Sequence, residues 1–229
     1  MHTPLAGISS MATRTLLHEL ADTWHARGGG DVACESVGGV DAARRVDAGE
    51  AFDWVVLAAD AIAKLGAAGR LHPGSETALA RAEVAIAVRA GAPRPAIDSE
   101  AALREAVLGA RTLGYSTGPS GVALQRLFAR WGIADTIRGR LVQAPPGLPV
   151  GTLVARGEVE LGFQQRSELM HVIGIAVLGT LPAGLEIVTT FSGAVCAAST
   201  RPDAARAWLD FVRSPSADAA RHRHGMLPP

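Results

Sequence analysis

The chain has 229 residues, of which 48% are hydrophobic, 19% are charged and 4% are aromatic. This composition is typical of a packed globular protein with room for one large or two small domains. Lys and Arg total 22 and Asp and Glu also total 22, so the formal net charge is zero. Nucleic-acid-binding proteins carry a basic surplus, which excludes this class, and no apolar run is long enough for membrane insertion.

The first third of the chain alternates predicted strands with predicted helices. Apolar segments at residues 5–9, 31–35 and 53–58 are typical of buried strands, and each is followed by residues with helical spacing. This alternation predicts a parallel sheet with helices on its faces, and ligands of open α/β sheets bind at the carboxyl ends of the strands. The candidate ligand-binding residues at those ends are Ser9, Ser10, Ser36 and Val37; the three serines can be ligand donors or simple helix caps.

An uncharged run at residues 114–122 links a predicted strand to a predicted helix. Pro119 suits the first position of that helix and Ser120 can cap it. Such a run leaves backbone N–H groups at the positive end of the helix dipole, which favours a small anion, a carboxylate or an oxyanion. An ordinary loop-to-helix junction is the alternative interpretation. The run lacks the lysine of a phosphate-binding P-loop, and its candidate ligand residues are Ser116, Thr117, Gly118, Ser120 and Gly121.

The remaining pattern predicts two lobes. Strands are predicted at residues 83–88, 112–115, 141–143, 158–163, 173–178, 186–191 and 193–198, and helices at 100–110, 120–131, 150–156 and 202–212. The strands at 83–88 and 186–191 suit two segments that cross from one lobe to the other. We expect lobe 1 to contain residues 1–83 and 191–229, and lobe 2 to contain residues 84–190.

Cys34 and Cys196 lie in apolar, strand-like segments, and their spacing matches no metal or redox motif. We expect two small buried side chains, and the sequence leaves a disulfide open. No cofactor or metal site is predicted, because no nucleophile elbow, P-loop or zinc motif occurs. The N-terminal residues lack the features of a signal peptide, so the expected location is the periplasm if a leader has been removed and the cytoplasm otherwise.

Five short motifs occur in order along nearly the whole chain, at residues 8–10, 36–40, 45–65, 155–163 and 199–211. In this order and spacing they resemble the type 2 periplasmic-binding-protein fold, and most closely the periplasmic molybdate-binding proteins of ABC transporters. The resemblance implies an α/β fold of two lobes with two crossing strands. It further implies a small anionic ligand held in a cleft between the lobes, closure of that cleft by hinge motion, and an ABC permease as partner.

The resemblance also maps ligand positions onto this sequence. They fall at Ser9 or Ser10, at Ser36, in the region 118–121, at Val150 and after Phe163. Where the family often has a tyrosine after that last strand, this chain has Gln164, Gln165 and Arg166. Only one of two successive side chains on an extended segment can face a cleft, so one of the two glutamines is expected to be structural. Arg166 is either a surface ion-pair partner or a bidentate carboxylate clamp, and these departures favour a larger, organic carboxylate over molybdate.

Two functions of different classes follow from the resemblance. The first is a receptor that captures a small oxyanion or carboxylate without changing it. The second is an isomerase of a small unsaturated polycarboxylate, similar to aconitate isomerase, built on the same fold. That chemistry needs an acid–base group beside the anion, and the sequence offers Glu35, Glu168 and His171, none of them in a motif that decides the matter.

Overall fold

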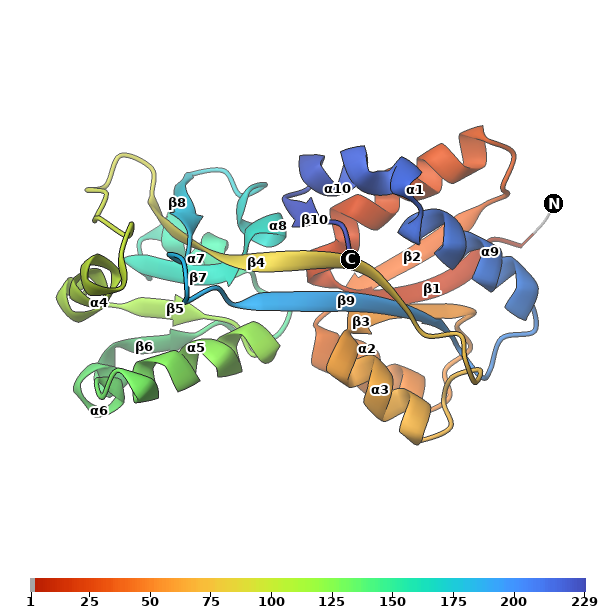
Figure 1. Ribbon diagram of the computed structural model, residues 1–229, viewed down its shortest axis with the longest axis horizontal. Coiled ribbons are helices and arrows are strands. Elements are labelled where there is room, and N and C mark those ends of the chain that lie inside the picture. The colour runs from red at the N-terminus through yellow and green to blue at the C-terminus, as the bar shows by residue number, and fades with distance from the viewer. Residues whose placement is uncertain (1–2) are drawn as a thin grey trace. The chain divides into compact units, whose positions relative to one another are not determined.

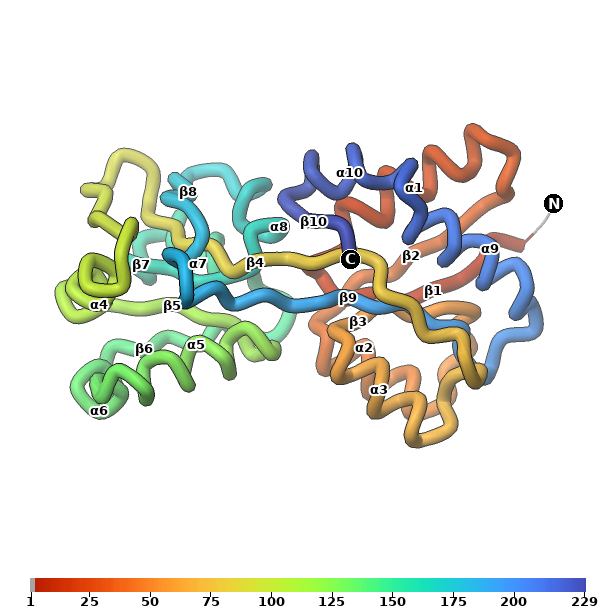
Figure 2. Tube along the Cα trace, viewed as in Figure 1, coloured from red at the N-terminus to blue at the C-terminus, as the bar shows by residue number. Residues whose placement is uncertain are grey.

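The computed structural model in Figure 1 describes residues 3–229, which form two compact units. The first unit comprises Met1–Ala82 and Thr189–Pro229, and the second comprises Glu83–Val188. Strand β4 (Thr77–Arg89) begins in the first unit and ends in the second, and its path can be followed in Figure 2. No helix within residues 3–229 is both long and apolar enough to cross a membrane.

The first unit is built on a mixed sheet. Strands β1 (Leu5–Ser10), β2 (Val32–Val37) and β3 (Trp54–Ala58) run parallel in the order β2-β1-β3. Strand β9 (Val188–Val195) pairs antiparallel with β3 and neighbours β4, and the short β10 (Met226–Leu227) pairs antiparallel with β4. The helical elements are η1 (Met11–Thr13), α1 (Arg14–Ala26), α2 (Gly39–Asp47), α3 (Ala59–Ala67), α9 (Pro202–Arg213), η3 (Pro215–Ala217) and α10 (Asp218–Arg223).

Helices cover both faces of this sheet, because β3 alternates buried side chains between two hydrophobic clusters. Trp54 and Val56 pack with side chains of α1 and α9, whereas Val55 and Leu57 pack with those of α2 and α3. The Trp54 ring lies against β1 at Gly7, where an added Cβ would come within 2.0 Å of the ring. Glycine at this position therefore permits the close contact between the tryptophan and the neighbouring strand.

The second unit has its own parallel core. Strands β7 (Leu161–Gln165), β5 (Leu113–Tyr115) and β6 (Leu141–Gln143) run parallel in the order β7-β5-β6. The second half of β4 pairs antiparallel with β7 on one side and with β8 (Ile175–Thr180) on the other. The helical elements are α4 (Glu100–Gly109), α5 (Pro119–Arg130), α6 (Ala134–Ile137), η2 (Arg138–Arg140), α7 (Val150–Arg156) and α8 (Arg166–Leu169).

The predicted order of elements is observed, with differences at the long strands. The strand expected at 83–88 begins earlier, at Thr77, and the two strands expected at 186–191 and 193–198 are the single strand β9. Gly193 stands at the start of the second of these expected strands. It instead lies inside the strand, where an added Cβ would come within 2.7 Å of Leu79 and Leu209, so it permits close packing. The short α6 and β10 had not been predicted.

Candidate functional site

At the carboxyl edge of the parallel strands in the first unit, two candidate serines contact each other. Ser9 and Ser36 are register neighbours on β1 and β2, and their hydroxyl oxygens lie 2.8 Å apart. Ser9 is fully buried and Ser36 is half-buried. Ser10, by contrast, uses its hydroxyl to accept a hydrogen bond from the Ala12 N–H at 3.2 Å and so caps the turn η1. The two interpretations of these serines therefore separate: Ser10 is a cap, and Ser9 and Ser36 form a pair.

Two helices begin at the same edge without a side-chain cap. Helix α2 follows β2 after Gly38, and α3 follows β3 after Ala58. Their first-turn N–H groups lack partners within the helix and carry the positive end of the helix dipole, so they can donate to an anion. Val37, which pairs in register with Ser10, leads directly into α2. The sequence analysis did not name these two helix starts as anion donors. Their only signal in the sequence is a Gly-Gly or Ala-Ala pair without a capping hydroxyl.

A thiol lies beside the serine pair. Cys34 Sγ is 3.5 Å from Ser9 Oγ and 3.8 Å from Ser36 Oγ. Burial raises the pKa of the Cys34 thiol, against the opposing effect of its hydrogen bonds with the two serines, so the thiol is neutral near neutral pH. Cys196 is buried in a separate cluster, and neither cysteine forms a disulfide. The carboxyl edge of this unit thus presents only neutral side-chain groups at the serine pair.

In the second unit, the run at 114–122 forms the junction between β5 and α5. Ser116 Oγ lies 3.2 Å from Ser120 Oγ, one helical turn away. The cap position is Gly118, with Pro119 as the first helical residue, so the expectation that Ser120 caps α5 is wrong. Its hydroxyl is inside the first turn and buried. An added Cβ on Gly121 would lie 1.9 Å from the Ser116 carbonyl oxygen, so the loop and the helix meet closely here. Thr117 at the tip is exposed.

A second set of candidates follows β6 and β7 at the same edge of the unit. The Val150 side chain belongs to a hydrophobic cluster, so only its backbone N–H can meet a ligand. Gln164, at the end of β7, accepts a hydrogen bond from the Gly151 N–H at 3.4 Å and donates one to Glu168 Oε1 at 2.8 Å. It therefore links the start of α7 to α8. This link supplies the structural glutamine that the sequence had suggested, and Gln165 beside it is also buried.

Glu168 is the one acid–base candidate that the structure places in a distinctive environment. It is half-buried in α8, and burial raises its pKa to about 7, opposed by the hydrogen bond from Gln164. Glu35 faces away from Ser36 on β2 and binds Arg45, with oxygen–nitrogen distances of 2.5 and 3.0 Å. His171 is exposed in the segment after α8. Arg166 is exposed and, within residues 3–229, forms no ion pair, so its guanidinium is available to a carboxylate.

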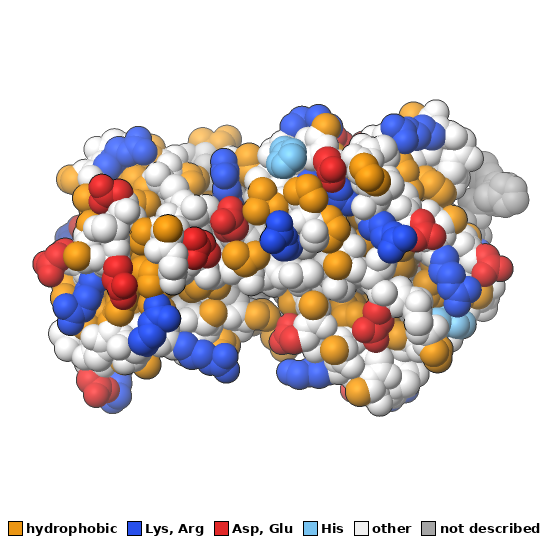
Figure 3. All heavy atoms as spheres, viewed as in Figure 1, with side chains coloured by type: hydrophobic (Ala, Val, Ile, Leu, Met, Phe, Trp, Pro, Cys, Tyr) orange, Lys and Arg blue, Asp and Glu red, His pale blue; other side chains and the backbone are white. Residues whose placement is uncertain are grey.

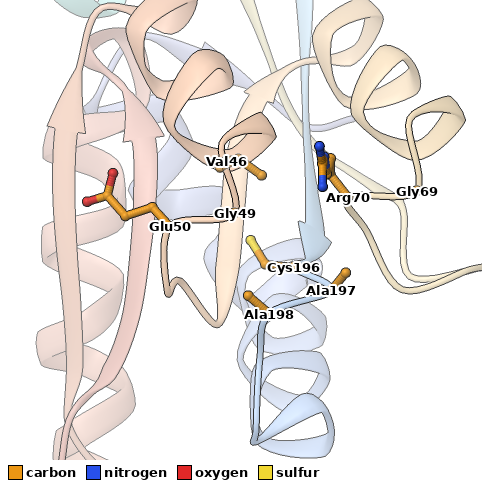
Figure 4. A pocket seen from close by; sticks show the side chains of 8 residues that line it. All are labelled: Val46, Gly49, Glu50, Gly69, Arg70, Cys196, Ala197 and Ala198. Atoms are coloured by element: carbon orange, nitrogen blue, oxygen red, sulfur yellow. The ribbon is translucent and has the colours of Figure 1, made fainter.

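A small cavity of about 150 Å³ opens at the opposite edge of the first unit (Figure 4). It lies where α2, α3 and β9 end, with Cys196 on its wall and Glu50 and Arg70 among its lining residues. Both charged groups are already paired, Glu50 with Arg45 at 2.5 Å and Arg70 with Asp47 at 3.1 Å. Across the part of the chain that the structure describes, no group of three metal-ligating side chains occurs. On the face drawn in Figure 3, side chains of both charge signs are interspersed.

Comparisons with known proteins agree with this architecture. The family model of bacterial extracellular solute-binding proteins matches residues 5–227. An aconitate isomerase from a Pseudomonas species is 38% identical over 185 residues, which is 80% of this chain and 70% of that protein. The periplasmic molybdate-binding protein of Azotobacter vinelandii superposes with a TM-score of 0.81 at 19% identity, covering 98% of this chain and 99% of that one.

The sulfate-binding protein of Mycobacterium tuberculosis superposes with a TM-score of 0.80 at 18% identity, covering 99% of this chain and 87% of that one. At these identities the two structures establish the fold alone. They confirm the predicted two-lobed α/β fold of the type 2 periplasmic binding proteins. The family model that matches residues 5–227 shows that the chain belongs to the family of bacterial extracellular solute-binding proteins.

Proposed function

We propose that the protein is a solute-binding protein for a small organic carboxylate or a comparable oxyanion. The observation that carries this proposal is the pair of neutral donor clusters, one at the carboxyl edge of each unit. Each cluster combines a contacting pair of serine hydroxyls with helix N-termini that have no side-chain cap. Hydroxyl and amide donors can hold an anion without a compensating basic residue.

An organic carboxylate is favoured over a tetrahedral oxyanion by two features. Arg166, the first residue of α8, is exposed and free of ion pairs within the described residues, and a guanidinium is suited to bidentate contact with a carboxylate. The relative named aconitate isomerase is 38% identical to this chain, against 19% for the molybdate-binding protein. A di- or tricarboxylate is therefore the ligand class we propose.

The same family membership supports a proposed partner and location. Family members are extracellular solute-binding proteins, which we take to imply work outside the cytoplasm and delivery of the ligand to an ABC permease. In this proposal the permease recognises the ligand-loaded protein, and the protein itself carries no membrane-spanning segment within residues 3–229.

A thermal-shift screen tests the proposed ligand class directly. Purified protein is heated with molybdate, tungstate, sulfate or phosphate and, in parallel, with citrate, cis-aconitate, trans-aconitate and succinate. A ligand present at about 100 times its Kd stabilises the folded state by about 2.7 kcal/mol, which is easily measured as a rise in Tm. We expect the rise with a carboxylate. A rise with molybdate or sulfate alone would assign an inorganic oxyanion instead, and no rise with any anion would contradict the proposal.

A second candidate function is isomerisation of an unsaturated polycarboxylate. Two observations favour it: the 38% identity to a protein named aconitate isomerase, and a half-buried carboxyl, Glu168 on α8, whose pKa burial raises to about 7. Incubating the protein with cis-aconitate and following the appearance of trans-aconitate by proton NMR tests this activity. Binding without interconversion would leave the protein as a receptor.

A further inference from the structure

Glu168 occupies an unusual position for a carboxylate at the ligand edge of the second unit. Its Oε1 accepts the hydrogen bond from Gln164 Nε2 at 2.8 Å, and Gln164 Oε1 in turn accepts from the Gly151 N–H at 3.4 Å. This chain of hydrogen bonds connects the end of β7, the first turn of α7 and the helix α8. The second oxygen, Oε2, makes no hydrogen bond to any of residues 3–229, so it is left to contact solvent or a ligand.

Among the described residues, the hydrogen bond from Gln164 favours the ionised form of Glu168, and no charged side chain contributes to that effect. Strand β7 and strand β8 carry no charged side chain, and α7 carries only Arg156, at its far end, 3.9 Å from Glu158. On α8 itself Arg166 is exposed, and His171 follows the helix on the surface. In the second half of β4, Glu83 and Arg89 stand at opposite ends of the paired segment, away from the alanines that contact Leu169 of α8.

We infer that Glu168 exchanges a proton with an unsaturated polycarboxylate bound at this edge, and that Gln164 is the residue that positions it. The inference rests on the isomerase candidate described above and names the group that performs its proton transfer. A carboxyl with one oxygen fixed by an amide and the other free has the geometry that such a transfer requires.

The reaction is a 1,3-shift of one proton, and its atoms balance without a redox partner. Glu168 Oε2, as a carboxylate, removes a proton from the methylene carbon of the substrate, which breaks one C–H bond and delocalises the electron pair over the allylic system. The proton on Glu168 Oε2 exchanges with solvent, and Glu168 then delivers a proton to the carbon at the other end of that system, so that the double bond moves and the carboxylate is restored. Meanwhile, the serine hydroxyls and helix N–H groups at the carboxyl edge of the second unit stabilise the charge that develops on the substrate carboxylate.

Efficient exchange requires a pKa close to the working pH, and burial supplies it. Burial raises the pKa of Glu168 to about 7, so both protonation states are populated near neutrality. Because the base form is the carboxylate, the rate should fall as the pH drops below about 7. The amide of Gln164 donates to the carboxylate and lowers this pKa, so removing the donor should raise it further.

The inference is tested by measuring the exchange of substrate protons with D2O together with the affinity for the substrate. Wild type, Glu168→Gln and the control Glu105→Gln are incubated with trans-aconitate in D2O, and loss of the methylene and vinyl proton signals is followed by NMR. Calorimetry measures trans-aconitate affinity for each variant. Glu105 is exposed on α4, so its variant should behave as wild type. We expect Glu168→Gln to bind within a few-fold of wild type but to exchange about 100-fold or more slowly.

The outcomes separate the inference from the binding function. Exchange by Glu168→Gln at the wild-type rate, or wild-type binding without exchange, would overturn the inference alone. Absence of aconitate binding in the wild type, with binding of citrate or succinate intact, would overturn the inference alone, whereas absence of binding of every carboxylate in the thermal-shift screen would overturn the carboxylate proposal as well. Should Glu168→Gln fold poorly by its Tm, Glu168→Asp replaces it: a shorter carboxyl that no longer reaches the substrate carbon should also slow exchange, and unchanged exchange would count against the inference.

The pH dependence of the exchange rate tests the positioning role of Gln164. In Gln164→Met the midpoint of the acidic limb of the exchange rate should move to higher pH, because the carboxylate loses its amide donor. A residue with a purely structural role would lower the rate at every pH and leave the midpoint in place. An unmoved midpoint would therefore overturn the positioning role of Gln164.

Discussion

The carboxyl edges of the two units have the same kinds of donor groups and differ in one neighbouring side chain. Each places a contacting pair of hydroxyls, Ser9 with Ser36 and Ser116 with Ser120, beside uncapped helix starts. Next to the first pair stands a neutral thiol, and next to the starts of α7 and α8 stands a carboxyl whose pKa burial raises to about 7. In the functions proposed above, the first unit therefore contributes only anion donors, whereas the second also contributes a group that exchanges a proton with the ligand.

At the opposite edge of the first unit, the carboxylate of Asp53 is hydrogen-bonded by groups within the fold. Buried Asp53, before β3, accepts hydrogen bonds from the Ala6 N–H at 2.9 Å, from Ser199 at 2.7 Å and from Arg201 at 2.6 Å. Arg201 also donates to two carbonyl groups near the start of β1. Asp53 and Arg201 thus use their hydrogen-bonding groups within the fold, and they stabilise the structure at that edge.

The largest effect on binding is expected from Gly121→Ala, which disrupts the junction between β5 and α5 in the second unit. The new Cβ would lie 1.9 Å from the Ser116 carbonyl oxygen, so the loop carrying Ser116 to Gly118 must move. Losing two hydrogen bonds to a charged ligand costs about 3 kcal/mol or more, which is a fall in affinity of about 100-fold. Calorimetry with the ligand from the thermal-shift screen measures it.

Gly109→Ala provides a matched control for that change. Gly109 also lies in a helix of the second unit, and an added Cβ there meets nothing within 4 Å. We expect wild-type affinity from this variant. Equal affinity of Gly121→Ala and Gly109→Ala would show that the β5–α5 junction takes no part in binding.

A smaller effect, on stability rather than binding, is expected from Asp53→Asn. Burial on its own raises the pKa of Asp53, but the hydrogen bonds from Ser199, the Ala6 N–H and Arg201 outweigh it and hold this pKa below its ordinary value. The ionised carboxylate therefore stabilises the fold above the unfolded pKa, about 3.9, and this contribution is lost as the pH falls through the lower folded value. Removing it should cost about 2 kcal/mol at pH 7.

Denaturant unfolding of wild type and Asp53→Asn at pH 7 and pH 3 measures this contribution. The difference in unfolding free energy between the two proteins should narrow at pH 3. Asp203→Asn is the control, since Asp203 is an exposed residue in the first turn of α9 and should change stability by less than about 0.5 kcal/mol. A difference that stays constant with pH would contradict the role assigned to the carboxylate.

Much of the fold could be predicted because its signals are local. The unbroken apolar run of β3, buried on both faces, and the repeated change from strand to helix are visible in the residues themselves. The division of β9 into two strands was wrong because Gly193 resembles a turn residue unless its neighbours Leu79 and Leu209 are known. The two-residue strand β10 is too short to leave a periodic signal, and pairing with β4 alone defines it.

The candidate site could be predicted less completely, because its contacts join distant elements. The sequence indicated that serines end neighbouring strands, yet only the register of β1 and β2 shows that Ser9 and Ser36 meet while Ser10 caps its own turn. Gln164 and Glu168 are four residues apart, a spacing usual within a helix. Here Gln164 ends a strand, and the contact depends on the bend into α8.

The smallest effects on binding are expected from single serine replacements. These variants compare the serine pair of the first unit with that of the second. Ser36→Ala and Ser120→Ala each remove one hydroxyl from its pair. A hydrogen bond to a charged ligand contributes about 1.5 kcal/mol at the low end, so each variant should bind about ten-fold more weakly. Ser216→Ala, in the exposed turn after α9, is the control and should bind as wild type.

Measured by calorimetry, similar losses in the two variants indicate that both serine pairs take part in binding. A loss confined to Ser120→Ala would assign the ligand to the second unit alone, where the titrating carboxyl lies, and would reduce the serine pair of the first unit to a structural contact. Because Ser36 is half-buried and Ser120 is buried, the Tm of each variant must accompany its affinity. Unchanged affinity with a lowered Tm in both would contradict the ligand role of either pair.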